Sequence, residues 1–276
     1  MHHIVTDQMQ RKVKIPTQPK RIISLVPSQT ELLFYLGLDK EVIGITKFCV
    51  HPHVMFKSKP RVGGTKQYNF EKIKSLEPDL IIGNKEENDQ TQIELLEKEY
   101  PVWMSDIFNV EDALEMILEI GKIVNRKAEA KVLIEKITDS FRHCKKVIQQ
   151  LIHRPRVAYF IWKNPTMVAA SQTFIHEMLE IAGFENIFAT ESRYPQISDS
   201  KLAAAQPEVI LLSSEPFPFK EKHIKEIQAI CPDADIRLVD GEIFSWYGNR
   251  LLLAGSYLEN LRLSFEKQNK LKDKNL

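Results

Sequence analysis

A proline-free stretch at residues 109–151 constrains the fold of this chain more than any other feature. In its second part the apolar residues recur every three or four positions, as on one buried helical face: Leu133, Ile134, Ile137, Phe141, Cys144, Val147, Ile148 and Leu151. A helix over 126–151 would be about 39 Å long, more than the width of a small domain. That length is typical of a strut between two lobes, and the alternative is a long surface helix of one large domain.

A shorter helix is expected just before the strut. Asn109 can cap it, and Glu111 and Asp112 would lie in its first turn, where acidic side chains are favourable. Asn125 offers a break and a second cap before the strut begins. Together the two helices predict a linking segment over 109–154.

Short apolar runs alternate with helical segments on both sides of this linking segment. The runs that predict strands are 21–26, 42–46, 80–83, 102–105, 157–162, 167–170, 209–212 and 236–239. Such alternation predicts mostly parallel sheets covered by helices on both faces. We therefore expect an α/β fold with two Rossmann-like lobes joined by a long inter-lobe helix. The expected parts are an N-terminal hairpin at 1–20, an N-terminal lobe at 21–108, the linking helices at 109–154 and a C-terminal lobe at 155–276.

The two lobes share a sequence pattern. Residues 73–86 read IKSLEPDLIIGNKE and residues 202–215 read LAAAQPEVILLSSE, so that proline, the following acid, the strand residues and a final glutamate coincide. This repetition indicates a duplicated lobe plan. It places Glu86 and Glu215 beyond the carboxyl ends of strands, where open α/β sheets present ligands and partners. Two acids in matching positions predict a docking pair.

Charge and hydropathy exclude several classes of function. Lys and Arg total 38 against 37 acidic residues, a net charge of +1, so no general field would attract nucleic acid. No run approaches the roughly 18 apolar residues of a membrane span. The first twenty residues are polar and charged, without the apolar core of a secretory signal, so no export signal is expected in the chain as written.

Cysteine and histidine residues are the candidate metal ligands. The three cysteines, Cys49, Cys144 and Cys231, are scattered and form no CxxC pair, which argues against a disulfide framework or a zinc knuckle. Cys49 and His51 lie together in the loop after the second predicted strand, and a thiolate with an imidazole suits cobalt, iron or zinc. Lining of a binding site without a metal bond, or simple packing, is the alternative.

Aromatic residues and one arginine are the candidates for holding a flat ligand. The aromatic candidates lie in predicted loops or at a strand end: Tyr68, Trp162, Trp246 and Tyr247. Their rings could stack on a macrocycle, while Arg250 could donate to a carboxylate, phosphate or amide. Trp162 could equally be a core residue.

Enzyme motifs are missing from the chain. It has no GxSxG elbow, no Walker lysine loop and no GxGxxG fingerprint. A thiol catalyst built from Cys49 and His51 is the best enzyme alternative. We therefore expect a protein that performs no chemistry.

Four segments resemble one family of proteins. They are RIISLVPSQTELLFYLGL at 21–38, HP at 51–52, VGGTKQYNFEKIKSLEPDLIIGN at 62–84 and WYGNR at 246–250. They resemble the vitamin B12-binding branch of the helical-backbone metal-chelate receptors, which are class III periplasmic binding proteins of ABC importers. The resemblance extends from about residue 13 to about residue 266.

The resemblance implies a ligand held in a cleft between the lobes, little closure on binding, and one acid per lobe that pairs with arginines of a membrane permease. Glu86 and Glu215 match those acids, and Glu87 competes with Glu86. It implies cobalamin or a related corrinoid as ligand. Haem or a ferric siderophore is the alternative, because relatives bind these and because the loop at 64–68 lacks a tryptophan that some cobalamin binders carry there.

Taken together, these features predict a substrate-binding component that captures a metal chelate and delivers it to a permease. No cofactor of its own, no nucleic acid and a monomeric state are expected, with the membrane contacted only through the permease. The resemblance implies the periplasm or the cell envelope, whereas the lack of a signal would suit the cytoplasm. An intracellular corrinoid carrier is therefore a further alternative.

Overall fold

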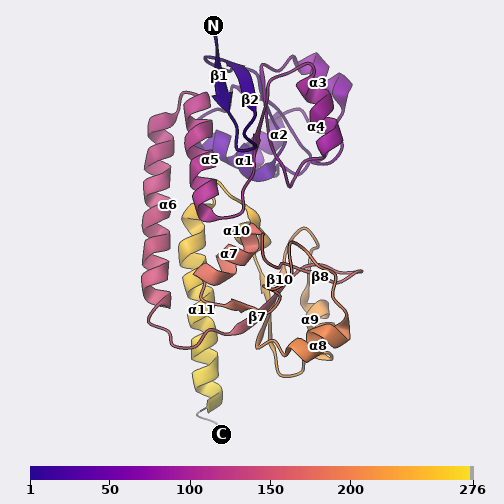
Figure 1. The fold of residues 1–276 in the computed structure, drawn as a ribbon, viewed down its shortest axis with the longest axis vertical. Coiled ribbons are helices and arrows are strands. Elements are labelled where there is room, and N and C mark those ends of the chain that lie inside the picture. Colours follow the sequence, from indigo (N-terminus) through magenta and orange to yellow (C-terminus); the bar gives the residue numbers. More distant parts are fainter. Residues whose placement is uncertain (274–276) are drawn as a thin grey trace. The chain divides into compact units, whose positions relative to one another are not determined.

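The computed structural model describes residues 1–273, with side chains to residue 267, and it divides into two compact units (Figure 1). Unit 1 contains residues 1–136 and 246–250, and unit 2 contains 137–245 and the chain from 251 onwards. The predicted hairpin at 1–20 and the first linking helix thus belong to unit 1. The last three residues of the predicted C-terminal lobe lie outside the described residues.

The long helix α6 (Lys127–Ile148) runs from unit 1 into unit 2, as predicted for the strut. Its buried side chains lie on the expected face, and they are Ala130, Leu133, Ile137, Phe141, Cys144 and Ile148. Ile134 and Val147 of the predicted face are only half-buried, and Leu151 lies beyond the end of the helix. The preceding helix, α5 (Val110–Ile123), is capped by Asn109, whose Oδ1 accepts the Asp112 amide at 2.8 Å. Local periodicity was therefore sufficient to locate both helices, and capping chemistry located the start of α5. Asn125, which was expected to cap the strut, has φ 56° and forms the break between the two helices.

Unit 1 is built on a four-stranded sheet in which all paired strands are parallel. The strand order is β4 (Val42–Ile45), β3 (Ile22–Ser24), β5 (Leu80–Asn84) and β6 (Val102–Ser105). All residues of β3, β5 and β6 are buried, as expected when helices cover both faces of a sheet. The other elements are the hairpin β1 (His2–Thr6) with β2 (Lys12–Pro16), α1 (Pro27–Tyr35), α2 (His53–Ser58), α3 (Phe70–Leu76) and α4 (Gln90–Glu97).

Unit 2 has a sheet of the order β11 (Asp235–Val239), β10 (Val209–Ser213), β7 (Arg156–Trp162) and β8 (Met167–Val168), with β9 (Glu185–Asn186) paired to β7. Only β8 pairs antiparallel in this described sheet. The helices are α7 (Phe174–Ile181), α8 (Asp199–Ala205), α9 (Glu221–Gln228), α10 (Gly241–Ser245) and α11 (Leu251–Asp273). The predicted mixed α/β fold with parallel sheets is confirmed.

The sequence repeat is also a repeat of backbone structure. Helices α3 and α8 are capped by Asn69 and Ser198, and both end on a left-handed residue, Glu77 at φ 43° and Gln206 at φ 47°. A proline follows each of these residues and ends the helix before the next strand. Each unit therefore contains the same helix, turn and strand.

An arginine closes this turn in both units. Arg21 Nε donates to the carbonyl of Glu77 at 2.8 Å, and Arg156 Nη2 donates to the carbonyl of Ala205 at 2.8 Å. Each arginine amide also bonds, at 2.9 Å, to the acid after the proline, which is Asp79 in unit 1 and Glu208 in unit 2. A cation is favourable there because the helix C-terminus carries partial negative charge.

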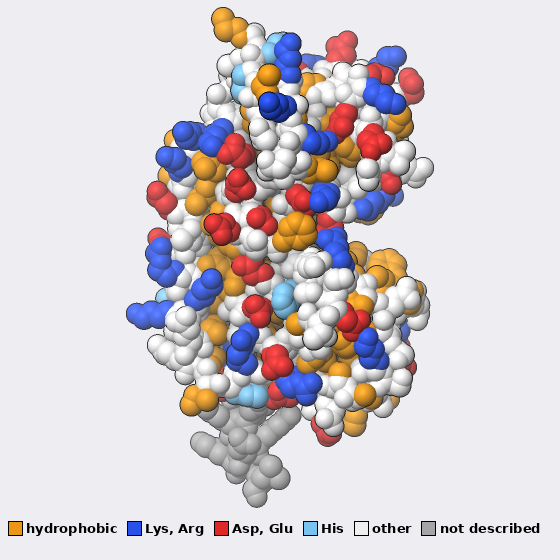
Figure 2. Space-filling model, in the orientation of Figure 1, with side chains coloured by type: hydrophobic (Ala, Val, Ile, Leu, Met, Phe, Trp, Pro, Cys, Tyr) orange, Lys and Arg blue, Asp and Glu red, His pale blue; other side chains and the backbone are white. Residues whose placement is uncertain are grey.

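The visible surface carries charges of both signs intermixed, in agreement with the near-zero net charge (Figure 2). Among residues 1–273, none of the helices combines the length and continuous apolar character that a membrane span requires.

Candidate functional site

The carboxyl ends of the four parallel strands of unit 1 meet at one edge of its sheet, which we call the carboxyl edge of unit 1. The loops after β4, β5 and β6 begin there, at residues 46, 85 and 106. Open α/β sheets bind ligands at this edge. The predicted residues Cys49, His51 and Glu86 all lie on these loops.

Cys49 is fully buried below that edge. Its Sγ lies 3.1 Å from the hydroxyl oxygens of both Thr30 and Thr46. Burial raises the pKa of the Cys49 thiol, so the sulfur is protonated at neutral pH. In this state Cys49 is a buried residue whose thiol packs against two threonine hydroxyls, and its predicted role as a metal ligand stays a prediction. Within residues 1–273 no group of three or more His, Cys, Asp and Glu side chains is placed to hold a metal ion.

His51 lies half-buried beside the segment 246–250, which belongs to unit 1 although both its chain neighbours belong to unit 2. The ring of Trp246 meets the imidazole edge-on, with centroids 5.7 Å apart. On the same ring, the guanidinium carbon of Arg250 lies 4.8 Å from the ring centre. Trp246 thus contacts both an imidazole and a cation, and the negative face of its π system favours the cation.

Arg250 is itself held by an acid. Its Nε and Nη2 each donate a 3.0 Å hydrogen bond to the carboxylate of Glu31 on α1. Both side chains are largely buried, so the pair is shielded from water and salt. Two of the five N–H donors of Arg250 therefore serve Glu31, and this ion pair fixes the segment 246–250 on unit 1. The predicted donation by Arg250 to a ligand stays a prediction.

Tyr247 and Gly248 complete this segment. Tyr247 is buried, and Gly248 has φ 147°, with its missing Cβ only 3.1 Å from the carbonyl oxygen of Ser28. Only glycine allows both this backbone conformation and this close approach to α1. The segment therefore packs directly on the first turn of α1.

Tyr68 lies in the hydrophobic core of unit 1, with 7% of its surface exposed. Its hydroxyl donates to the carbonyl of Thr65 at 2.8 Å, and burial raises the pKa of the phenol. Tyr68 therefore anchors the loop at 64–68 to the core of unit 1.

Trp162 is an exposed aromatic residue at the carboxyl end of β7 in unit 2, with 40% of its surface accessible. Its ring contacts Phe217 edge-on at 5.8 Å, and Phe217 contacts Phe219 at 4.8 Å. Of the predicted aromatic candidates, Trp162 offers the most open ring. Phe217 was missed, although the run PFPF at 216–219 could have indicated it.

Glu86 and Glu215 lie two residues beyond the ends of β5 and β10, as the repeat predicted. Both are half-buried and their backbones are anchored: the Glu86 amide bonds to Asn84 Oδ1 at 2.9 Å, and the Glu215 amide bonds to Ser213 Oγ at 3.3 Å. The carboxylate of Glu215 also accepts a 2.8 Å hydrogen bond from Ser245. The Glu87 amide shares the Asn84 oxygen at 3.1 Å, so both acids of the first unit start from one fixed turn.

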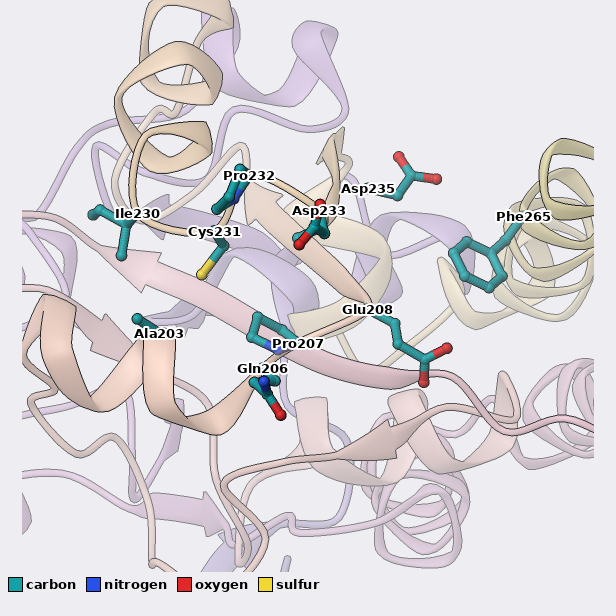
Figure 3. A pocket seen from close by; sticks show the side chains of 11 residues that line it. Ala203, Gln206, Pro207, Glu208, Ile230, Cys231, Pro232, Asp233, Asp235 and Phe265 are labelled. Carbon is teal, nitrogen blue, oxygen red and sulfur yellow. The ribbon is translucent and has the colours of Figure 1, made fainter. Parts of the chain in front are cut away.

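A separate cavity of about 390 Å³ lies at the opposite, amino edge of the unit 2 sheet (Figure 3). Pro207, Glu208 and Asp235 line it at the starts of β10 and β11, and Cys231 and Phe265 complete its wall. None of the predicted site residues lines this cavity.

A family model described as periplasmic binding protein matches residues 22–229, from β3 to the end of α9. The chain belongs to this family. The match includes strands of both units, so the resemblance seen in the sequence is confirmed.

Curated relatives of this periplasmic binding protein carry transport and cobalamin names. An "uncharacterized ABC transporter substrate-binding lipoprotein" of Bacillus subtilis (strain 168) is 23% identical over 214 residues, covering 75% of this chain and 68% of the relative. A "vitamin B12-binding protein" of Vibrio vulnificus (strain CMCP6) is 25% identical over 198 residues, covering 70% of this chain and 71% of the relative.

Among solved structures, the apo form of a periplasmic haem-binding protein from Roseiflexus sp. RS-1 has a TM-score of 0.77. It is 22% identical and covers 89% of this chain and 97% of that chain. This likeness shows that the fold is shared over nearly the whole length.

Proposed function

We propose that this protein is the substrate-binding component of an ABC importer and that it captures cobalamin or a related corrinoid. The observation that carries the proposal is the alignment of 70% of the chain with a relative named for vitamin B12 binding. The relative named as an ABC transporter substrate-binding lipoprotein supports the transport role. A place in the periplasm or on the cell envelope, a monomeric state and the absence of catalysis are parts of the same proposal.

The carboxyl edge of unit 1 suits such a ligand. His51 could contact the chelate or its metal, and its imidazole ring packs edge-on with the ring of Trp246. On the same loop Phe48 and Val50 expose 49% and 38% of their surfaces, although both are large apolar residues. A flat apolar ligand would remove this surface from water and gain roughly 25 cal/mol per Å². Trp162, which the sequence predicted to contact a ligand, is an exposed aromatic residue of unit 2.

Haem is the second candidate ligand. A haem-binding protein shares the fold, and the loop at 64–68 contains no tryptophan. An imidazole such as that of His51 is a common axial ligand of haem iron.

Titration with different chelates tests the proposal. Trp246 and Trp162 are natural reporters, and the fluorescence of the purified protein would be followed with cyanocobalamin, aquocobalamin, haemin and a ferric siderophore in turn. We expect saturable quenching with cobalamin at micromolar or lower concentration. A shift of the visible band with aquocobalamin or haemin that is lost in His51→Ala would show ligation by the imidazole. Saturation with haemin alone would replace cobalamin by haem, and no saturation with any chelate would contradict the proposal.

Glu86 and Glu215 are proposed to dock the permease. Combined Glu86→Ala and Glu215→Ala should leave ligand affinity unchanged and reduce uptake of labelled ligand by cells in which the natural gene is replaced. A matched control removes two exposed acids of other elements, with Glu94→Ala and Glu185→Ala. Normal uptake by the first double variant would remove the docking role.

A further inference from the structure

The loop after β4 begins with a lysine and a phenylalanine that form an exposed pair. Lys47 Nζ lies 5.0 Å from the centre of the Phe48 ring, and about half of the Phe48 surface is open to solvent. No carboxylate of residues 1–267, the part of the chain whose side chains are described, forms an ion pair with Lys47, whereas Lys85 of the neighbouring loop is bound to Asp106 at 2.6 Å. Lys47 is therefore a cation held beside an exposed ring without a neutralising acid.

The pair is held in place by the adjoining loop at 63–68. The Lys47 amide donates to the carbonyl of Gly63 at 2.8 Å. A side chain at Gly64 would begin only 3.3 Å from the Phe48 ring and 3.5 Å from Lys47 Cε. Because Gly64 has no side chain, both side chains can approach this position closely. The Lys47–Phe48 pair is thus positioned by two loops.

A second cation, Lys66, lies on the loop at 63–68. Lys66 Nζ donates to the backbone carbonyl of Glu86 at 2.7 Å, and its side chain is exposed. The rim of the proposed site thus combines an open apolar ring with two ammonium groups. A ligand that matches this rim has a flat apolar body to cover Phe48 and an anionic group at its edge to meet Lys47.

We infer that Lys47 and Phe48 determine the ligand selectivity at the rim of the proposed site. They favour chelates that carry a carboxylate or phosphate at the edge of the ring system. The inference rests on the proposed function and refines its ligand class. Phe48 contributes affinity for the apolar body, and Lys47 contributes discrimination by charge. Cobalamin carries a phosphate and haem carries carboxylates, so the same chemistry can come from either source.

Two pairs of ligands that differ in an anionic group test the role of charge, and the effect of Lys47→Gln is compared within each pair. Cyanocobalamin would be compared with dicyanocobinamide, which lacks the phosphate-linked nucleotide, and haemin with its dimethyl ester, which lacks free carboxylates. Each ligand would be titrated against the full chain, Lys47→Gln, Phe48→Ala and the control Lys40→Gln, which removes an exposed lysine before β4, at the other end of that strand.

For whichever pair of ligands the protein binds, we expect Lys47→Gln to lower the affinity for the ligand with the phosphate or carboxylates about threefold to tenfold. The affinity for the ligand without that group should stay unchanged. Phe48→Ala should lower the affinity for both ligands of the pair equally, and Lys40→Gln should change neither affinity. Raising the salt concentration should reduce the preference of the natural protein for the anionic ligand over its partner in the pair. It should not change the relative affinities of Lys47→Gln for the two ligands. An effect confined to the cobalamin pair identifies the phosphate, and one confined to the haemin pair identifies the carboxylates.

Equal affinities of Lys47→Gln and the natural protein for the charged ligand would overturn the inference, and so would an equal loss for both members of the pair. In either case the proposed function would stand, because a chelate is still bound. Failure of the natural protein to bind any of the four ligands would overturn both.

Discussion

Arg250 donates two hydrogen bonds of 3.0 Å to the carboxylate of Glu31, which precedes it by 219 residues. The bond holds the segment 246–250 in unit 1, while the helices on either side of that segment, α10 and α11, belong to unit 2. The chain therefore returns to unit 1 after completing most of unit 2, and this ion pair secures the return. Because Trp246 lies against Arg250 and His51, the same pair also positions the proposed site.

Removing either partner of this ion pair should loosen the segment. Arg250→Ala leaves a largely buried carboxylate without its donor, and we expect a loss of about 1–3 kcal/mol of stability. Glu31→Gln should lower the free energy of unfolding by less. Arg250→Lys should not restore the stability of the natural protein, because an ammonium cannot donate two hydrogen bonds in the forked geometry of a guanidinium. Hydrogen exchange of the amides at 246–250 and urea unfolding would measure both effects. Full protection of the segment in Arg250→Ala would contradict the assignment.

Cys49 should be unreactive in the folded protein. Burial raises its pKa and removes its sulfur from solvent, so iodoacetamide at pH 8 should label it only after unfolding. Burial also raises the pKa of Cys231, but 7% of its surface is exposed and it lines the cavity of unit 2, so it should react sooner than Cys49 (Figure 3). Peptide mass spectrometry of native and denatured samples would compare them. Rapid native labelling of Cys49 would favour the thiol-catalyst alternative.

The left-handed residues that end α3 and α8 should tolerate glycine well. Glu77→Gly and Gln206→Gly remove the steric cost of φ 43° and φ 47°, and each should stabilise its unit by about 0.5–1 kcal/mol. Lys98→Gly is the control, because Lys98 ends α4 at φ −67°, where glycine only adds freedom to the unfolded chain. Thermal unfolding would show a higher midpoint for the first two variants and a lower one for the control. Lower midpoints for all three would contradict the prediction.

His223 should make unit 2 less stable in mild acid. Burial lowers the pKa of its imidazole below the ordinary 6.5, and Lys163, Lys222 and Lys220 add to this effect. As the pH falls below about 6.5 the unfolded chain gains a proton before the folded one does, so stability is lost until the folded pKa is passed. His223→Asn, which keeps an acceptor for the Lys220 amide, should flatten this dependence. Urea unfolding between pH 5 and pH 7.5 would measure it, with the exposed His53→Asn as control, and identical slopes for all proteins would contradict the prediction.

The candidate site could be predicted from the sequence only in part. The positions of Glu86, Glu215 and His51 after strands follow from local patterns. The core location of Tyr68 does not, because a loop aromatic can point either to the core or to solvent. Phe48 and Lys47 were overlooked as a pair, because only the structure shows the ammonium beside the ring and the hydrogen bond of the Lys47 amide to Gly63.

The sequence alone determined the local structure: the buried face of α6, the caps of α5 and α3, and the repeated helix, turn and strand of the two units. Each of these depends on residues within a few positions of one another, so periodicity and capping chemistry suffice. Only the tertiary structure decided that Arg250 serves Glu31, that Cys49 is sealed beneath two threonines, and that 246–250 belongs to unit 1. These are contacts between distant segments, and they depend on how the packed elements come together, which no short stretch of sequence records.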